Sequence, residues 1–462
     1  MKQLSNLAMI IKSVLSGLCI FCLVGASVNA QKTSNLEQAR RLCAEGDQLH
    51  NQANYAGALQ KYDQAIRLAP NYADSYFLMG RACYKLNDYP AALTAARKAT
   101  QLQPNDHRYQ GLLGDIYLFG QTTRDYRKAS EAYRQALRID SGNSYYWAAL
   151  GDSYFNLSEW QNAIDSYQKS VEIRPDQAAV HYYKGQAHFK LRQFTEFKQA
   201  FQQVLKSEPK SKNDLSSIAR VHSFSGQLNE AVRFSSKAIA FRNDDNDAGE
   251  YISLSWYYSF LEDHVKAHAA ATKAIELDPK SHMGYTNKCR ALDDLGLYEQ
   301  AVSTCQQALQ LKPEDGETLF YLGQTYRLKK NVRKATELNR RAINALDKTI
   351  KEDPLRTDSY DLLYLYGNAL LADNKTRQAI ENYEATLRVR PHFPQARKNL
   401  VIAYLRVNNK VAALKQYDEL RQISTKKADE LKPAMPVFVV LVGSEEPPYS
   451  GFQAKEETLP DH

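Results

Sequence analysis

The stretch Asn143–Asp176 decides the fold of this 462-residue chain, and it reads NSYYWAALGDSYFNLSEWQNAIDSYQKSVEIRPD. Its apolar residues recur three and four positions apart, which predicts two amphipathic helices. The polar residues around Asn156–Ser158 predict the turn between them, and Pro175 ends the second helix. Two helices this short cannot bury a core by themselves, so the unit requires neighbours of the same kind.

Seven residues of this stretch carry a known repeat pattern. They match W-x2-L-G-x2-Y, A-x3-F and P, with Tyr in place of Phe: Trp147, Leu150, Gly151, Tyr154, Ala163, Tyr167 and Pro175. The stretch therefore resembles a tetratricopeptide repeat. Steps of about 34 residues from Gly151 find ten further units, so the resemblance covers roughly residues 36–425. It implies an all-α fold, a right-handed α-solenoid of about eleven helix-turn-helix repeats.

Two units depart from the regular spacing. In the third, the segment between the helices, residues 119–127, has gained three residues over its counterpart in Asn143–Asp176. The ninth is followed by extra residues before the next unit begins, which predicts that residues 344–352 extend its second helix.

The first thirty residues form a separate segment. Lys2 and Lys12 give it a positive start, Val14–Val24 is an apolar run, and small residues precede Ala30. This pattern is typical of a secretory signal peptide covering residues 1–30, and it predicts a periplasmic or secreted protein. An uncleaved membrane anchor is the alternative, although the apolar run is shorter than the ~20 residues that a span needs.

Residues 426–462 are expected to form a C-terminal capping segment and a flexible tail. Within them, residues 436–442 are apolar and rich in β-branched side chains. Two interpretations stay open: an extended segment folded over the last helix pair, or a strand donated to a partner, including another copy of the chain.

The charge of the chain argues against a nucleic-acid partner. The formal net charge of +8 falls to +6 when Lys2 and Lys12 leave with the first thirty residues, and the sequence shows no dense basic stripe. A mild positive charge allows peripheral contact with anionic envelope polymers.

Four cysteines remain after residue 30: Cys43, Cys83, Cys289 and Cys305. An even number in an exported protein suggests disulfides. However, these residues occupy helix-packing positions, where Cys behaves as a small apolar side chain. Packing is the favoured interpretation, and Cys289–Cys305 is the pair expected to bridge if any does.

The family resemblance also implies a binding surface. In tetratricopeptide proteins the first helices line a concave groove that binds protein or peptide ligands. Carried over to this chain, the groove residues are Phe77, Arg81, Tyr84, Asp115, Phe119, Tyr145, Asp152, Phe155, Tyr182, Tyr183, Gln186, Phe189, Arg220, Trp256, Phe260, Arg290, Phe320 and Arg327. The alternative is that many of these rings pack against the next helix. The family's clamp for a carboxyl-terminal Asp-Val tail looks absent, because Asp47, Arg81 and Asp115 hold its positions.

No motif for catalysis, cofactor binding or zinc binding occurs in the sequence. His181, His188 and His222 are candidate metal ligands, but they hold core positions and are expected to be packing residues. The acidic segment 244–247 lacks the ligand spacing of a calcium loop and predicts a linker. Asp293 and Asp294 are the only acidic pair expected to face the groove.

The sequence therefore predicts a non-catalytic scaffold or adaptor without a cofactor, and leaves its oligomeric state open. An envelope, secretion or polysaccharide-export assembly would suit such a protein, by analogy only. The alternative is an enzyme or polysaccharide-binding subunit that uses the groove as a cleft.

Overall fold

A computed structural model describes residues 31–241, 247–352 and 359–435, with the side chains of residues 359–360 left aside. Three of the segments discussed above fall partly or wholly outside these ranges: the signal-like residues 1–30, the acidic residues 244–246 and the apolar residues 436–442.

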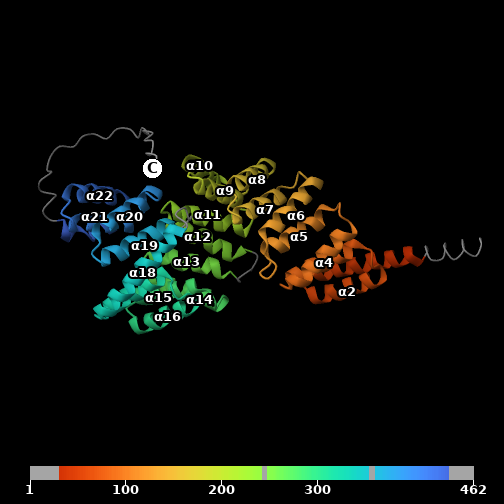
Figure 1. Cartoon of the computed structure of the whole chain (residues 1–462), viewed down its shortest axis with the longest axis horizontal. Coiled ribbons are helices and arrows are strands. Elements are labelled where there is room, and N and C mark those ends of the chain that lie inside the picture. Colours follow the sequence, from red (N-terminus) through yellow and green to blue (C-terminus); the bar gives the residue numbers. More distant parts are fainter. Residues whose placement is uncertain (1–30, 242–246, 353–358, 436–462) are drawn as a thin grey trace, which may run out of the picture. The chain divides into compact units, whose positions relative to one another are not determined.

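The described residues form helices that fold back on one another in eleven consecutive pairs (Figure 1). In chain order the pairs are residues 31–51 with α2 (Tyr55–Leu68), α3 (Ala73–Lys85) with α4 (Tyr89–Leu102), α5 (His107–Phe119) with α6 (Tyr126–Ile139), α7 (Ser144–Asn156) with α8 (Trp160–Ile173), α9 (Ala178–Lys190) with α10 (Phe194–Lys206), α11 (Lys212–Phe224) with α12 (Leu228–Ile239), α13 (Ala248–Phe260) with α14 (His264–Leu277), α15 (His282–Asp294) with α16 (Tyr298–Leu311), α17 (Gly316–Leu328) with α18 (Val332–Glu352), α19 (Ser359–Ala372) with α20 (Thr376–Val389), and α21 (Pro394–Arg406) with α22 (Lys410–Ile423). The short helices α23 (Thr425–Asp429) and η2 (Lys432–Ala434) follow.

The prediction of an all-α array of about eleven helix hairpins is confirmed, and the described ranges contain no strand. From α2 to α10 and from α12 to α23, each helix packs against its neighbours in the chain. The chain divides into two compact units, residues 1–218 and 219–462, with the boundary inside α11. Among the described residues, no helix has both the length and the apolar composition of a membrane span.

Both predicted departures from regular spacing are present. The connection between α5 and α6 is the long one, and α18 runs for 21 residues to Glu352. In the ten other pairs, a residue with positive φ stands directly before the N-cap of the second helix. Glycine holds this place twice, as Gly226 and Gly296, whereas Ala53, Asn87, Ser158, Arg192, Glu262, Lys330, Asn374 and Asn408 hold it with φ between 56° and 62°.

A close contact between glycine and tyrosine joins the two helices of several pairs. A Cβ atom on Gly151 of α7 would lie 2.6 Å from ring carbons of Tyr167 on α8. The same contact recurs between Gly46 and Tyr62, Gly114 and Tyr133, and Gly367 and Tyr383. These four tyrosines are almost fully buried. Only glycine lets the backbone of the first helix approach a ring this closely.

The hydroxyl of each of these tyrosines donates a hydrogen bond to the residue that follows the glycine. Tyr167 donates to Asp152 at 2.7 Å, and the matching bonds are Tyr62 to Asp47, Tyr133 to Asp115, and Tyr383 to Asn368 at 3.2, 2.7 and 2.8 Å. A buried hydroxyl thus has an acceptor, as buried polar groups require. The bond also fixes the side chain of a residue on the first helix.

Burial changes the acidity of two of these carboxyl groups. It raises the pKa of Asp152 to about 6, against the opposing effect of the hydrogen bond from Tyr167. It also raises the pKa of Asp115, which accepts hydrogen bonds from Tyr133 and Tyr145. The folded chain therefore binds a proton at Asp152 more tightly than an ordinary aspartate does.

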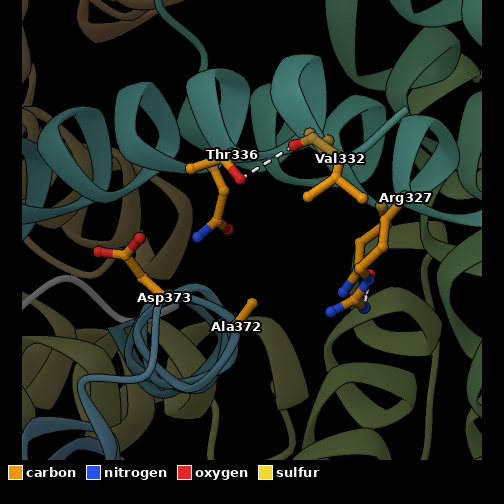
Figure 2. Close-up of a pocket in the computed structure, with 9 residues that line it drawn as sticks. Arg327, Val332, Thr336, Ala372 and Asp373 are labelled. Atoms are coloured by element: carbon orange, nitrogen blue, oxygen red, sulfur yellow. Dashed lines mark hydrogen bonds between the residues drawn. The ribbon is translucent and has the colours of Figure 1, made fainter. Parts of the chain in front are cut away.

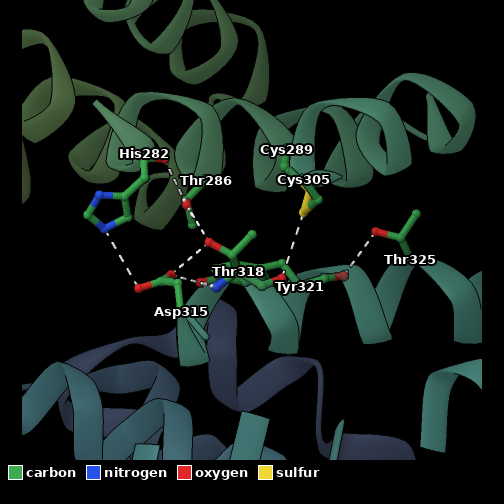
Figure 3. The surroundings of a disulfide bond; sticks show 8 residues. All are labelled: His282, Thr286, Cys289, Cys305, Asp315, Thr318, Tyr321 and Thr325. Atoms are coloured by element: carbon green, nitrogen blue, oxygen red, sulfur yellow. Dashed lines mark hydrogen bonds and ion pairs between the residues drawn. A yellow bond between two sulfur atoms is a disulfide. The ribbon is translucent and has the colours of Figure 1, made fainter. Parts of the chain in front are cut away.

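A disulfide joins Cys289 of α15 to Cys305 of α16, with 5.3 Å between the two Cα atoms (Figure 3). The sequence favours a packing role for all four cysteines. The structure corrects this interpretation for Cys289 and Cys305, the pair expected to bridge if any does, because these two form a disulfide. Cys43 and Cys83 are buried free thiols, as packing residues would be. Next to the disulfide, Thr286 and Thr318 share a 2.6 Å hydrogen bond that links α15 to α17.

Replacing Gly151 with Ala will destabilise the chain, because the new methyl group would overlap the buried ring of Tyr167. Overpacking of this kind costs ~1–3 kcal/mol. Gly323 is the matched control: it holds the same place in its pair, but Asn339 stands where the tyrosine would be and the nearest atom to a new Cβ is 3.4 Å away. Gly323→Ala should gain up to ~1 kcal/mol from helix propensity. Denaturation followed by circular dichroism measures the free energy of unfolding of both variants. Equal changes in the two variants would contradict the glycine–tyrosine contact.

Replacing Asp152 with Asn will make stability less dependent on pH. Because the folded pKa of about 6 lies above the ordinary value of 3.8, the wild-type chain loses stability as pH rises through this interval. The amide of the Asp152→Asn variant cannot ionise, yet it can accept the bond from Tyr167, as Asn368 does from Tyr383. The variant should be more stable than wild type at pH 7 by on the order of 1 kcal/mol, and the difference should vanish near pH 4. Denaturation at both pH values measures this, and a difference that is the same at both would refute the assignment.

Candidate protein-binding surface

The structure places the expected groove residues in three classes of exposure. Tyr145, Phe119 and Arg327 are exposed, the first two at 47% and 45% of their surface. Gln186, Phe189, Arg290 and Phe320 are buried, each below 9% exposure. The rest are half-buried: Phe77, Arg81, Tyr84, Asp115, Asp152, Phe155, Tyr182, Tyr183, Arg220, Trp256 and Phe260.

In residues 1–218, a chain of ring contacts runs across neighbouring pairs. Phe155 of α7 lies 5.0 Å from Trp160 and 6.1 Å from Tyr183 of α9, measured between ring centres. Tyr183 is 5.3 Å from Tyr182, which stacks on Phe201 at 5.5 Å. Phe155, Tyr182 and Tyr183 stay half-buried, so each still shows part of its ring to solvent. Phe155 of α7 and Tyr182 and Tyr183 of α9 therefore form one aromatic surface.

The same unit carries an arginine–phenylalanine group nearer its beginning. The guanidinium groups of Arg81 and Arg108 lie 5.7 and 5.5 Å from the ring centre of Phe77. Arg81 also approaches Asp47 of the preceding pair at 3.9 Å, and Arg108 binds Asp74 at 3.0 Å. A cation over an aromatic face is attracted to the electrons of the ring. With the two ion pairs, side chains from three consecutive helix pairs hold this group together.

Two expected groove acids serve the packing of the repeats. Asp115 accepts a 2.6 Å hydrogen bond from Tyr145 of the next pair as well as the bond from Tyr133. Asp152 accepts from Tyr167 within its own pair. One oxygen of each carboxylate is thus engaged inside the protein, which the repeat pattern alone does not reveal.

The expectation of exposure is corrected for Phe189 and Gln186. Phe189 packs its ring 5.7 Å from Phe194 and 5.2 Å from Phe197 of the second helix in its pair. Phe197 stands where a small alanine is usual in this pattern, so its large ring fills the space between α9 and α10. These contacts draw Phe189 inward and leave little of it for a partner.

In residues 219–462, the expected groove residues lie among the protein's own side chains. The ring of Phe260 lies 4.2 Å from Trp256, 5.5 Å from Phe393 and 6.5 Å from Tyr364. Phe393 precedes α21 and Tyr364 belongs to α19, so the α13–α14 pair meets two later pairs here. We call Trp256, Phe260, Tyr364 and Phe393 the aromatic hub.

Arg290 and Phe320 are also corrected to the interior. The guanidinium of Arg290 lies 5.4 Å from the ring of Phe260 and donates a 3.1 Å hydrogen bond to the hydroxyl of Tyr321. Phe320 packs in the core formed with Leu319 and Leu346. The first helices of this unit thus face rings of other pairs, where the family resemblance predicts an open groove.

The three candidate metal-binding histidines do not converge. His188 and His222 share 2.6 Å hydrogen bonds with Gln193 and Gln227, each at the start of the next helix, and His181 bonds the carbonyl of Pro175 at 2.8 Å. Within the described ranges, no group of three or more His, Cys, Asp or Glu residues has the geometry to hold a metal ion.

The acidic pair Asp293 and Asp294 stands at the end of α15. Burial raises the pKa of Asp293 to about 6 and also raises the pKa of Asp294. Asp294 lies 3.3 Å from the ring nitrogen of His264, which is an ion pair when that histidine is protonated. This contact gives the Asp294 carboxylate a structural neighbour.

A small hollow lies where α17, α18 and the end of α19 meet (Figure 2). Arg327 and Asp373 stand on different sides of it, and Val332, Thr336 and Ala372 complete the labelled lining. Its volume of about 130 Å³ is below the ~300–1,000 Å³ of typical ligand pockets. Arg327, an expected groove residue, thus lines a space suited to water.

Four sequence families, described as TPR or tetratricopeptide repeats, match residues 49–116, 151–191, 178–211, 286–354 and 364–428. Among curated proteins, TPR repeat-containing protein MJ1428 of Methanocaldococcus jannaschii is 22% identical over 56% of this chain and 47% of its own length. Human protein O-mannosyl-transferase TMTC3 is 22% identical over 64% of this chain and 33% of its own. The Hsp70-Hsp90 organizing protein of Triticum aestivum is 25% identical over 52% of this chain and 41% of its own length.

The chain spans about half or less of the length of these relatives, so what they share with it is the repeat array. The matched segments together cover more than half of the chain, and they lie on the paired helices and include the glycine–tyrosine contacts of Gly151 with Tyr167 and of Gly367 with Tyr383. The chain belongs to the tetratricopeptide repeat family, whose fold is a scaffold for protein interaction.

Proposed function

We propose that this chain is a non-catalytic scaffold that binds a protein or peptide partner on the first helices of residues 1–218. The observation that carries this proposal is the aromatic surface of α7 and α9, continued toward α5 by the exposed Tyr145 and Phe119. Rigid aromatic rings lose little conformational freedom on binding and are enriched at protein interfaces.

The unequal burial of the two units supports this choice of surface. Phe119 and Tyr145 each leave almost half of their surface to solvent, whereas Arg290 and Phe320 in the other unit are buried. The name of a chaperone organizing protein among the relatives agrees with a scaffold role. The transferase name belongs to a protein of which this chain spans 33%, so we do not extend that activity to this chain.

We further propose that the protein is exported and acts in an envelope, secretion or polysaccharide-export assembly. The signal-like residues 1–30 support export. The Cys289–Cys305 disulfide agrees with it, because such bonds persist in oxidising compartments. The oligomeric state is left open.

A photo-crosslinking residue at position 119 will form covalent adducts with the partner, because this position lies on the proposed surface. A photoreactive phenylalanine analogue would replace Phe119 in the full chain, and adducts would be detected by gel shift after irradiation in the source cells. The matched control is position 411, since Val411 is equally apolar and 83% exposed but lies on the second helix α22.

Adducts at position 119 should weaken several-fold when Tyr145 is replaced by Ala. Equal adducts at positions 119 and 411, or none at 119, would refute the proposed surface.

Protein isolated from its source without reduction should begin at Gln31 and contain the Cys289–Cys305 disulfide. Alkylation under denaturing conditions followed by peptide mass spectrometry measures both, and Cys43 and Cys83 should be alkylated as free thiols. A peptide that includes residues before Gln31, together with four alkylated cysteines, would refute export.

A further inference from the structure

In residues 219–462, two hairpin turns contact the C-terminal pairs. The turn between α13 and α14 contains Glu262, whose carboxylate binds the amino groups of Lys426 and Lys427 on α23. These residues are more than 160 positions apart in the sequence. The turn before α12 contains Gly226, where a Cβ atom would lie 2.7 Å from the carbonyl oxygen of His392.

Three further contacts lie between the same parts of the unit. Arg390 donates a hydrogen bond to the carbonyl of Ser223, and Gln395 donates one of 3.3 Å to the carbonyl of Phe260. The guanidinium of Arg390 lies 5.7 Å from the ring centre of Trp256. Together with the aromatic hub, these contacts close the unit on itself.

This closure is separable from the folding of the helix pairs. From α12 to α23, the extensive packing of each described helix is against the one or two nearest helices in the chain. The stability of repeat arrays is close to a sum of such nearest-neighbour terms. The contacts between the α13 turn and α23 are made by side chains, so their loss would leave every pair with its neighbours.

The contact at Glu262 is ionic and partly open to solvent. The side chains of Glu262 and Lys426 are 30% and 72% exposed, whereas Lys427 is 14% exposed and also binds Glu430 at 2.8 Å. The two lysines lower the pKa of Glu262 to about 2, so its carboxylate is charged at any physiological pH. Such a contact responds to salt and to competing charges.

The position of Glu262 in its turn sets it apart from the equivalent residues. Among the positive-φ turn residues of the described hairpins, Glu262 alone carries a carboxylate. It adopts φ 62°, in the left-handed region that is unfavourable for a residue with a long side chain. The turn itself does not require an acid there, since Gly226 and Gly296 hold the same place in other pairs. The ionic contact with α23 therefore gives this residue a role beyond the turn.

We propose that Glu262, Lys426 and Lys427 form an ionic latch, an autoinhibitory contact that keeps residues 219–462 closed over the rings of Trp256 and Phe260. Opening the latch exposes these rings while the helix pairs remain folded. The inference rests on the proposed function in one respect: the exposed rings would bind a protein or peptide.

Pulsed electron paramagnetic resonance between spin labels at positions 265 and 421 tests the latch in the full chain without any partner. Val265 follows the α13 turn and is 68% exposed, and Arg421 is exposed near the end of α22. Cys19, Cys22, Cys43 and Cys83 are replaced by Ala so that only the two engineered cysteines react. Glu262→Lys should produce a longer-distance population that the parent protein lacks at low salt.

Two further variants make the result decisive. The charge-swapped variant with Glu262→Lys, Lys426→Glu and Lys427→Glu should restore the short distance. Lys330→Glu changes the equivalent turn residue of another pair, and it should leave the distance unchanged. An unchanged distance in Glu262→Lys would overturn the latch. Loss of helical circular dichroism in that variant would also overturn it, because closure would then be part of folding. Neither result would bear on the crosslinking surface at Phe119.

Discussion

The structure depends on how closely two helices of a pair can approach. At four pairs, a first-helix glycine lies against a buried tyrosine ring, and the tyrosine hydroxyl bonds the next side chain of the first helix. Sterics therefore set the spacing of the helices, and the hydrogen bond sets the orientation of the residue beside the glycine. Every surface that the first helices of these pairs present is built on this contact.

The same contact explains why acids on the first helices are poor indicators of function. Asp115 and Asp152 hold positions that the family uses for ligands, yet both accept hydrogen bonds from tyrosines of the array. A carboxylate used in this way stabilises the repeat and is partly withdrawn from a partner. The binding proposed for residues 1–218 would then rest mainly on its rings and on cations such as Arg81.

The two units use the same helix hairpin with different results. In residues 1–218, rings such as Tyr145 and Tyr183 keep surface open to solvent. In residues 219–462, the ring of Phe260 packs on Trp256 and meets Phe393 and Tyr364 from later pairs. Positions that form the proposed partner surface in one unit make internal contacts in the other, so a site cannot be transferred between repeats on position alone.

The sequence by itself determined the helix pairs, their number, the long connection before α6 and the extension of α18, because each follows from local spacing of small, apolar and helix-ending residues. It also identified the cysteines able to bridge, since one helix pair brings Cys289 and Cys305 together. Only the tertiary structure decided which first-helix residues remain exposed. Burial of Phe189 depends on the ring of Phe197 across the pair, and burial of Arg290 beside Phe260 depends on how successive pairs stack. Contacts such as Glu262 with Lys427 join residues far apart in the chain, and no local pattern specifies them.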